Sequence, residues 1–291
     1  MKLKPKYLSM VIPARWYAGG KGLDDFRATM LGQKHIRKLV DVTNSADCFP
    51  GVNIAGGICY FLWDNTYSGD CAVVNIKEGE CTSENIRSLD EFDYFVRSNL
   101  ALTIIRKVLA SKDKLMNKVV YSRNYFNLPT TVSGSNEFGI NTIKILTSKG
   151  FIYLHKNTVT DKESILDKYK VIITYAMSGG NKPTSEGNYQ ILSSLRILNP
   201  KEACTETYLI LDVFEKKQEA ENLVSFMSSK FARFLLLQAL SSIHITKDKF
   251  CFVPYVGLKT WTDEMLYSKY SLKSEEIDYI EKLIKPMEIG G

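Results

Sequence analysis

Three short apolar runs stand out in the first 75 residues. Residues 7–13, 36–42 and 58–63 are rich in Val, Ile, Leu and aromatic side chains, which is typical of strands buried in a sheet. We expect the first to be a buried parallel strand. Between the first two runs, four apolar residues recur at helical spacing: Leu23, Phe26, Met30 and Leu31. The pattern predicts the order strand, helix, strand, strand. This unit is incomplete, because one helix cannot cover both faces of a parallel sheet.

Helical and β-like segments follow. Residues 88–110 have apolar positions at helical spacing, with Ser88 as the expected N-cap. Four short β-like runs then alternate with loops: 143–146, 150–154, 171–175 and 207–211. Residues 216–244 predict one long helix with an apolar stripe, and shorter helices are expected to begin at Thr262 and Ser274. The predicted fold class is therefore α+β (mixed α/β): an incomplete α/β sheet, then a mostly β region with supporting helices.

Composition narrows the class of protein. The 291 residues are 45% hydrophobic and 24% charged, which excludes a disordered or fibrous chain. No apolar run approaches the roughly twenty residues of a membrane span, and no signal peptide is recognisable, so we expect a cytoplasmic protein without membrane contact. The six cysteines form no C-x-x-C pair, and no His lies at metal-finger spacing, so we expect free thiols and no metal site.

The formal net charge of +6 is unevenly distributed. Residues 97–156 contain ten Lys or Arg, two acids and several interleaved aromatic residues. Such a segment suits a nucleic-acid surface, because cations neutralise phosphates and rings stack on bases. It equally suits a solvated helix end beside ordinary core aromatics, so both interpretations stay open. The DNA-binding candidates in this segment are Arg106, Lys107, Lys112, Lys114, Lys118, Arg123 and Lys144.

Motifs that would carry catalysis are missing from the sequence. The glycine-rich stretch at 19–22 lacks the spacing of both common phosphate-binding loops, and neither G-x-S-x-G nor H-E-x-x-H occurs. The carboxylates that neighbour one another in the sequence diverge on a helix and cannot flank one bond. We therefore name no catalytic residue.

Two ends of the chain resemble one family. Residues 3–16, LKPKYLSMVIPARW, continue into a glycine-rich turn, and C-F-P-G-V at 48–52 precedes the apolar run at 58–63. These stretches resemble the late part of the catalytic domain of N6-adenine DNA methyltransferases from bacterial restriction–modification systems. Later segments resemble the far end of the same proteins: 203–208, 252–254, 261–264, 266–267 and 270.

The resemblance implies a division of the chain. Residues 1–75 would be a partial methyltransferase α/β unit and 76–118 a linking helix. Residues 119–258 would be the target recognition domain including its long helix, and 259–291 a C-terminal helical tail. In this family the target adenine is extruded and stacked between aromatic rings, and the family's late aromatic position falls on Phe49. The alternative for Phe49 is that it plugs the edge of the sheet.

Two motifs of the family are missing from this chain, and their absence bears on its function. The family's glycine motif for the cofactor and its N-P-P-[YF] catalytic motif do not occur in this chain. We therefore expect no cofactor in this chain, S-adenosylmethionine being implied only for the complete enzyme, and no methylation of DNA by this polypeptide alone. The chain is expected to be a fragment, a split subunit or a truncated gene product.

Two functions follow from the resemblance. The first is a sequence-specific DNA recognition module of an adenine-specific methyltransferase, with double-stranded DNA as partner and a separate or upstream catalytic half. In it, the loop at 178–183 and its neighbours would reach base edges through Asn181, Lys182 and Asn188, each of which is equally an ordinary turn residue. The alternative is a self-standing specificity subunit that docks a separate methyltransferase or restriction subunit. A small-molecule enzyme would need a convergent polar pocket.

Overall fold

A computed structural model describes residues 5–19, 22–52, 54, 56–177, 183–192, 194–240, 243–257 and 259–287. The chain divides into two compact units, Met1–Ile104 and Ile105–Gly291. Both contain helices and sheets, which confirms the mixed α+β class.

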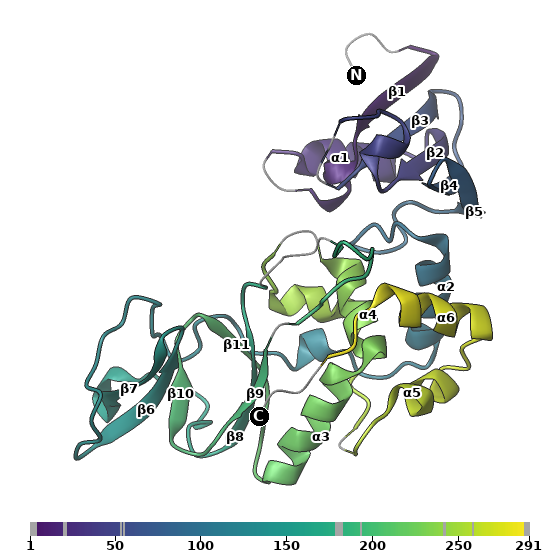
Figure 1. The fold of residues 1–291 in the computed structure, drawn as a ribbon. Helices are drawn as coiled ribbons and strands as arrows, with labels where there is room; N and C mark the ends of the chain where they lie inside the picture. Colours follow the sequence, from purple (N-terminus) through teal and green to yellow (C-terminus); the bar gives the residue numbers. More distant parts are fainter. Residues whose placement is uncertain are drawn as a thin grey trace. The chain divides into compact units, whose positions relative to one another are not determined.

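The first unit is built on a five-stranded sheet of order β1-β3-β2-β4-β5 (Figure 1). Its strands are β1 (Tyr7–Pro13), β2 (Ile36–Val42), β3 (Ile58–Asp64), β4 (Cys71–Lys77) and β5 (Glu80–Arg87). Strands β2 and β4 run parallel, and the other neighbours are antiparallel. The boundary expected at residue 75 lies inside β4, and the first compact unit extends to 104.

Strand β1 differs from its prediction. It is an edge strand, antiparallel to β3, and several of its side chains are exposed, so the expectation of a buried parallel strand was wrong. An apolar run specifies a strand but not the direction of its neighbour. The hairpin of β4 and β5 was missed because β5 has the polar sequence ECTSENIR. Its two-residue turn has positive φ at Glu78 (54°) and Gly79 (81°), the geometry that matches the twist of the strands.

One face of this sheet carries the main core of the first unit. The helix α1 (Asp24–Gly32) and a 3₁₀ turn (Ala14–Ala18) supply Trp16, Met30 and Leu31, which pack on Phe61 and Trp63. The opposite face holds a smaller cluster of Val40, Val42, Ile58 and Val74, packed by the loop residue Ile54.

The helix expected over 88–110 begins only at Asn99, as α2 (Asn99–Ala110). The buried Arg87 guanidinium donates to the carbonyls of Val96 (2.7 Å) and Arg97 (3.1 Å), and the Asn75 side chain donates to the Arg97 carbonyl at 2.9 Å. These donors hold the chain extended, so the predicted cap at Ser88 was wrong. The Asn75 side chain also accepts from the Asn99 N–H at 2.9 Å, where α2 begins.

The second unit contains two three-stranded sheets (Figure 1). One has the order β10-β6-β7, from Glu202–Cys204, Thr142–Thr147 and Gly150–His155. The other has the order β11-β8-β9, from Tyr208–Phe214, Tyr169–Thr174 and Leu195–Leu198. These strands confirm all four predicted β-like runs. A shared core joins the sheets, with Ile145 and Ala203 from the first and Ile172 and Ile210 from the second.

Four helices accompany these sheets in the described chain: α3 (Lys217–Ser228), α4 (Lys230–Ala239), α5 (Asp263–Lys269) and α6 (Ser274–Leu283). The single helix expected over 216–244 was wrong, since it breaks at Ser229. The Ser229 hydroxyl accepts from the Ala232 N–H at 3.1 Å, and the Asp263 carboxylate accepts from the N–H groups of Lys230 (3.0 Å) and Phe231 (2.8 Å). The local cap Ser229 and the distant Asp263 carboxylate thus restart the helix together. The predicted start of α5 at its cap Thr262 is confirmed.

All six cysteines are free thiols. Within the described ranges, no helix is long and apolar enough to span a bilayer, and no cluster of three metal-ligating side chains is present.

Candidate nucleic-acid interface

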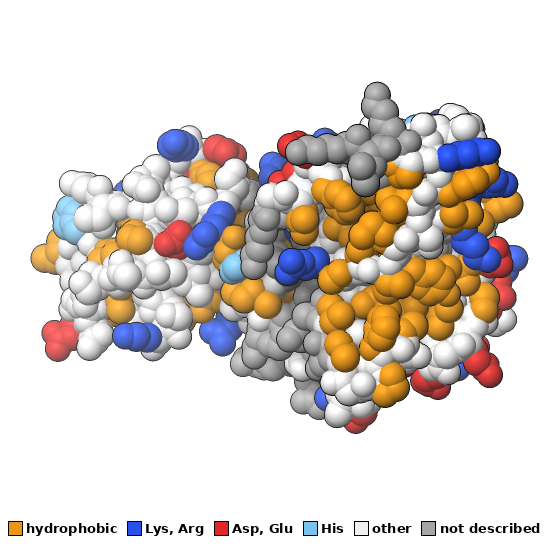
Figure 2. All heavy atoms as spheres, turned by 90° about the horizontal axis from the view of Figure 1, so that it is seen from above, with side chains coloured by type: hydrophobic (Ala, Val, Ile, Leu, Met, Phe, Trp, Pro, Cys, Tyr) orange, Lys and Arg blue, Asp and Glu red, His pale blue; other side chains and the backbone are white. Residues whose placement is uncertain are grey.

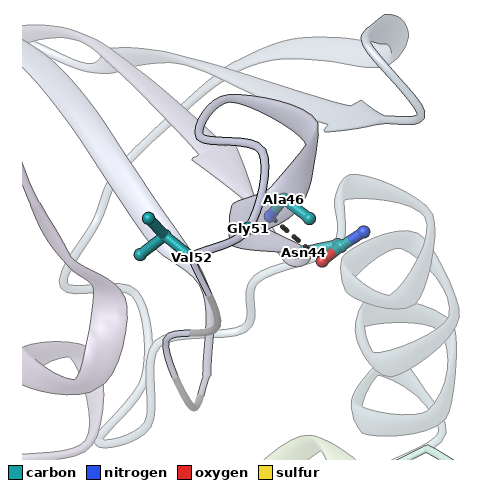
Figure 3. A pocket seen from close by; sticks show the side chains of 4 residues that line it. All are labelled: Asn44, Ala46, Gly51 and Val52. Atoms are coloured by element: carbon teal, nitrogen blue, oxygen red, sulfur yellow. Dashed lines mark hydrogen bonds between the residues drawn. The ribbon is translucent and has the colours of Figure 1, made fainter.

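The loop between β2 and β3 encloses a small hollow of about 290 Å³ (Figure 3). Its lining comes from Asn44, Ala46, Gly51 and Val52. The Asn44 side chain accepts from the Ala46 N–H at 3.2 Å and donates to Asp47 at 2.8 Å, which fixes the start of the loop. This volume lies at the lower limit of about 300 Å³ for small-molecule pockets, and the lining offers one polar side chain. The hollow therefore does not form the convergent polar pocket of an enzyme.

Phe49 lies on the same loop, two residues before Gly51. Its N–H donates to the Ser45 carbonyl at 2.9 Å, and its carbonyl accepts from the Val52 N–H at 3.0 Å, so the backbone of the turn is fixed. Phe49 as a whole is 43% exposed. A partly exposed ring on an ordered turn is available for stacking on another flat ring.

The buried base of this loop is an ion pair. Asp41 is 1% exposed, and Arg97 reaches it through Nη2 at 2.7 Å and Nε at 3.1 Å. The same guanidinium donates to the Gly56 carbonyl at 2.7 Å. Arg97, the first cation of the basic segment, therefore holds the loop in place from within the first unit.

Three of the predicted DNA-binding cations are engaged in ion pairs. Lys107 meets Glu276 at 2.6 Å, Lys144 meets Glu202 at 2.8 Å, and Arg123 meets Glu206 at 3.1 Å. Glu276 is buried, so Lys107 balances a charge that lacks water. These ion pairs could not be predicted from the sequence, because each acid lies more than fifty residues from its cation.

Other predicted cations face solvent. Arg106, Lys112, Lys114 and Lys118 are all exposed, and among the described residues neither Lys112 nor Lys118 has an ion-pair partner. Lys114 lies 5.8 Å from the centre of the Tyr255 ring, beside the Asp212 carboxyl, whose pKa is raised by burial. The exposed cations of the basic segment thus include four in the stretch from 106 to 118.

The three base-reading candidates have different outcomes. Asn181 and Lys182 lie outside the described residues. The Asn188 side chain accepts from the Thr184 hydroxyl at 2.7 Å and donates to Glu186 at 3.1 Å. Asn188 is therefore hydrogen-bonded within its own turn, and its contact with a base edge stays a prediction.

No pattern in the sequence indicated one group of aromatic and charged side chains in the second unit. The Tyr175 ring lies 4.0 Å from the Arg123 guanidinium and stacks on His244 with centroids 4.9 Å apart. Both Arg123 and His244 are exposed, whereas Tyr175 is half-buried. Since these residues come from three distant segments, no spacing rule brings them together.

Comparison with known proteins supports the class inferred from the sequence. Residues 1–49 match the family described as Eco57I restriction-modification methylase. The chain is thus related to restriction–modification methylases, which confirms the resemblance of its N-terminal part.

Two individual proteins are similar to this chain. An uncharacterized adenine-specific methylase of Mycoplasma pneumoniae is 41% identical over 76 residues, which are 26% of this chain and 18% of that protein. The type IIG restriction endonuclease BpuSI, a solved structure, is 13% identical with a TM-score of 0.37, over 95% of this chain and 42% of that one. The chain therefore spans less than half the length of either protein.

Proposed function

We propose that this chain is the DNA-recognition part of an adenine-specific methyltransferase of a restriction–modification system. The observation that carries the proposal is the match of residues 1–49 to a restriction-modification methylase family. These residues belong to the first compact unit, and the chain continues from it into the second unit. The unpaired lysines at the start of that second unit are the groups that would meet phosphates, and double-stranded DNA is the partner.

The proposal assigns catalysis to a different part of the enzyme. The N-P-P-[YF] motif is missing from this sequence, so S-adenosylmethionine would bind elsewhere in the complete enzyme. In the complete enzyme, Phe49 of this chain would stack on the extruded adenine. This chain alone is expected to transfer no labelled methyl group from S-adenosylmethionine to DNA, and clear transfer by the single chain would contradict the division of roles.

Salt-dependent binding to duplex DNA tests the proposal. Each lysine–phosphate contact contributes about 0.9 to the slope of log affinity against log salt concentration, because it releases a counterion. Replacing Lys112 and Lys118 by Gln should therefore reduce the slope by up to about 2. Lys282→Gln removes an exposed lysine of α6 as the matched control. An affinity independent of salt, or equal effects of all three substitutions, would contradict phosphate binding by residues 106–118.

A specificity subunit that docks a separate catalytic chain is the second candidate. It is favoured by β1, an edge strand whose side chains Tyr7, Met10 and Val11 are exposed. Figure 2 shows a face of the molecule on which apolar side chains gather. Separately, an apolar edge strand is a template for pairing with another chain. If this candidate holds, methyl transfer should appear when a separately expressed catalytic half is added, and Val11→Glu should abolish it without affecting DNA binding by this chain.

A further inference from the structure

Two apolar side chains project from the loop that precedes β6. Phe138 is 78% exposed and Ile140 is 91% exposed. The loop that carries them meets β6 at the open end of the β6–β7 hairpin, opposite the turn at residues 148–149 (Figure 1). Leaving such groups in water is unfavourable by roughly 1.5–3 kcal/mol for each side chain relative to burial, so their exposure calls for an explanation.

The loop that carries them is ordered by several hydrogen bonds. Ser135 pairs with Tyr153 of β7 through two backbone hydrogen bonds of 2.8 and 3.1 Å. The Thr142 hydroxyl donates to the Gly139 carbonyl at 2.7 Å, and the Lys156 N–H donates to the Asn141 carbonyl at 2.8 Å. Since both flanks of the projection are tied to the hairpin, the apolar pair is presented from a fixed base.

Close packing reinforces this base. The Phe138 ring meets the Tyr153 ring edge-on, with centroids 5.8 Å apart. At Gly134 the chain runs so close to β7 that a Cβ would lie 2.5 Å from the Tyr153 carbonyl oxygen. A side chain at Gly134 would therefore push the loop away from β7, and glycine permits the approach.

Cations lie at both ends of the hairpin that carries the projection. Lys156 adjoins Asn141 at the open end, near the apolar pair, and Lys149 lies in the turn at the opposite end. The acid in the loop is Glu137, and the cation Lys144 is balanced by Glu202. Among the described residues, neither Lys149 nor Lys156 has an ion-pair partner.

This combination fits duplex DNA better than another protein. A stable protein interface buries about 800 Å² on each partner, much more than two side chains provide. Proteins that kink DNA insert one or two apolar side chains between base pairs while nearby cations bind the phosphates. The apolar pair beside Lys156, with Lys149 at the far end of the same hairpin, provides both the apolar side chains and the cations of that mode of binding.

We propose that Phe138 and Ile140 form a wedge that inserts between stacked base pairs of duplex DNA. The inference rests on the proposed DNA-recognition function and adds a mode of binding to it. By opening the stack, the wedge would lower the free energy needed to extrude a neighbouring base. It would act by shape and so require no base-edge hydrogen bonds.

A duplex with one abasic site tests the wedge, because its stack is already interrupted. Unstacking one step requires a few kcal/mol, so the abasic duplex should bind at least about tenfold more tightly than the fully paired duplex. Fluorescence anisotropy of end-labelled duplexes measures both affinities. Phe138→Ser with Ile140→Ser should abolish the preference, whereas Phe138→Leu with Ile140→Leu should retain it. Ile86→Ser, at another exposed apolar position, is the matched control and should keep the preference.

The outcomes separate the two proposals. Salt-dependent binding of the paired duplex without any abasic preference would overturn the wedge and leave DNA recognition standing. A preference that survives the double Ser variant would also overturn it. Failure to bind either duplex would overturn both proposals. Sedimentation provides the last arm: a dimer that becomes monomeric in the double Ser variant would assign the two side chains to self-association instead.

Discussion

Lys170 provides a stringent test of the packing in the second unit. It lies on β8 and is completely buried, with its ammonium inside a cage of backbone carbonyls. Nζ donates to the carbonyls of Lys168 (2.6 Å), Leu166 (2.9 Å) and Asn199 (3.2 Å), and reaches that of Ile165 at 3.5 Å. Burial lowers the pKa of Lys170 from its usual 10.5 to about 8, although nearby acids such as Glu202 oppose the shift.

The sign of the effect follows from which state keeps the proton. Below pH 8 both the folded and the unfolded chain hold the Lys170 proton. Between pH 8 and 10.5 the unfolded chain alone retains it, so the free energy of unfolding rises with pH. Since each tenfold change in an equilibrium is worth about 1.4 kcal/mol, the rise from this group should approach 3 kcal/mol, as an order of magnitude.

Replacing Lys170 by Met removes this pH dependence. Three of the four carbonyls also accept a backbone N–H, and only that of Lys168 loses its partner, which costs about 1–3 kcal/mol. The variant should therefore fold. Urea titrations of fluorotryptophan-labelled protein at several pH values measure the free energy of unfolding of the wild type and of Lys170→Met. The signal of Trp261 reports the unfolding of the second unit, in which Lys170 lies.

The difference in unfolding free energy between wild type and Lys170→Met should rise by about 3 kcal/mol from pH 8 to 10.5. Groups that do not interact with Lys170 cancel in the difference. Cys204 does interact with Lys170, but burial raises the pKa of Cys204 to about 12, above this range. Lys168→Met, which removes a neighbouring lysine paired with Glu215 at 3.1 Å, should show no such trend. A flat difference would refute the reasoning. A falling one would mean that the carbonyl cage favours the charged form.

Three further predictions concern the ion pairs and the exposed ring. Arg97→Met leaves the buried Asp41 carboxylate unpaired and should destabilise the first unit by about 3–5 kcal/mol in urea, and an unchanged unfolding midpoint would contradict the structural role of Arg97. Lys107→Gln strips Glu276 of its cation and should lower the stability of the second unit by about 2 kcal/mol or more, while leaving the salt slope of DNA binding unchanged. Phe49→Ala should change stability by no more than about 0.5 kcal/mol if the ring is free to stack, whereas a loss above about 2 kcal/mol would show that it plugs the sheet.

Local signals predicted part of the fold. The apolar runs of β6, β7 and β8 and the cap Thr262 act within a few residues, so the sequence alone revealed them. The polar strand β5 had no such signal, because its place in the sheet comes from the turn before it and the partner β4.

Long-range partners explain the remaining errors. Arg87 takes the carbonyls that a helix over 88–98 would have used, and no periodicity within that segment records it. The same holds for the basic segment. Its charge was visible in the sequence, but the buried Glu276 that engages Lys107 lies 169 residues away. A count of cations therefore overstated the charge available to DNA.

The Asp263 carboxylate that caps α4 also has a consequence for folding during synthesis. The first N–H groups of α4 emerge from the ribosome more than thirty residues before the carboxylate that accepts their hydrogen bonds. The Arg233 guanidinium of α4 donates to the Lys285 carbonyl at 2.7 Å, a partner made later still. Helix α4 therefore reaches its final stability only once residues 263–285 have been translated. A nascent chain stalled before residue 263 should expose this helix to proteases, although every residue of the helix is already present.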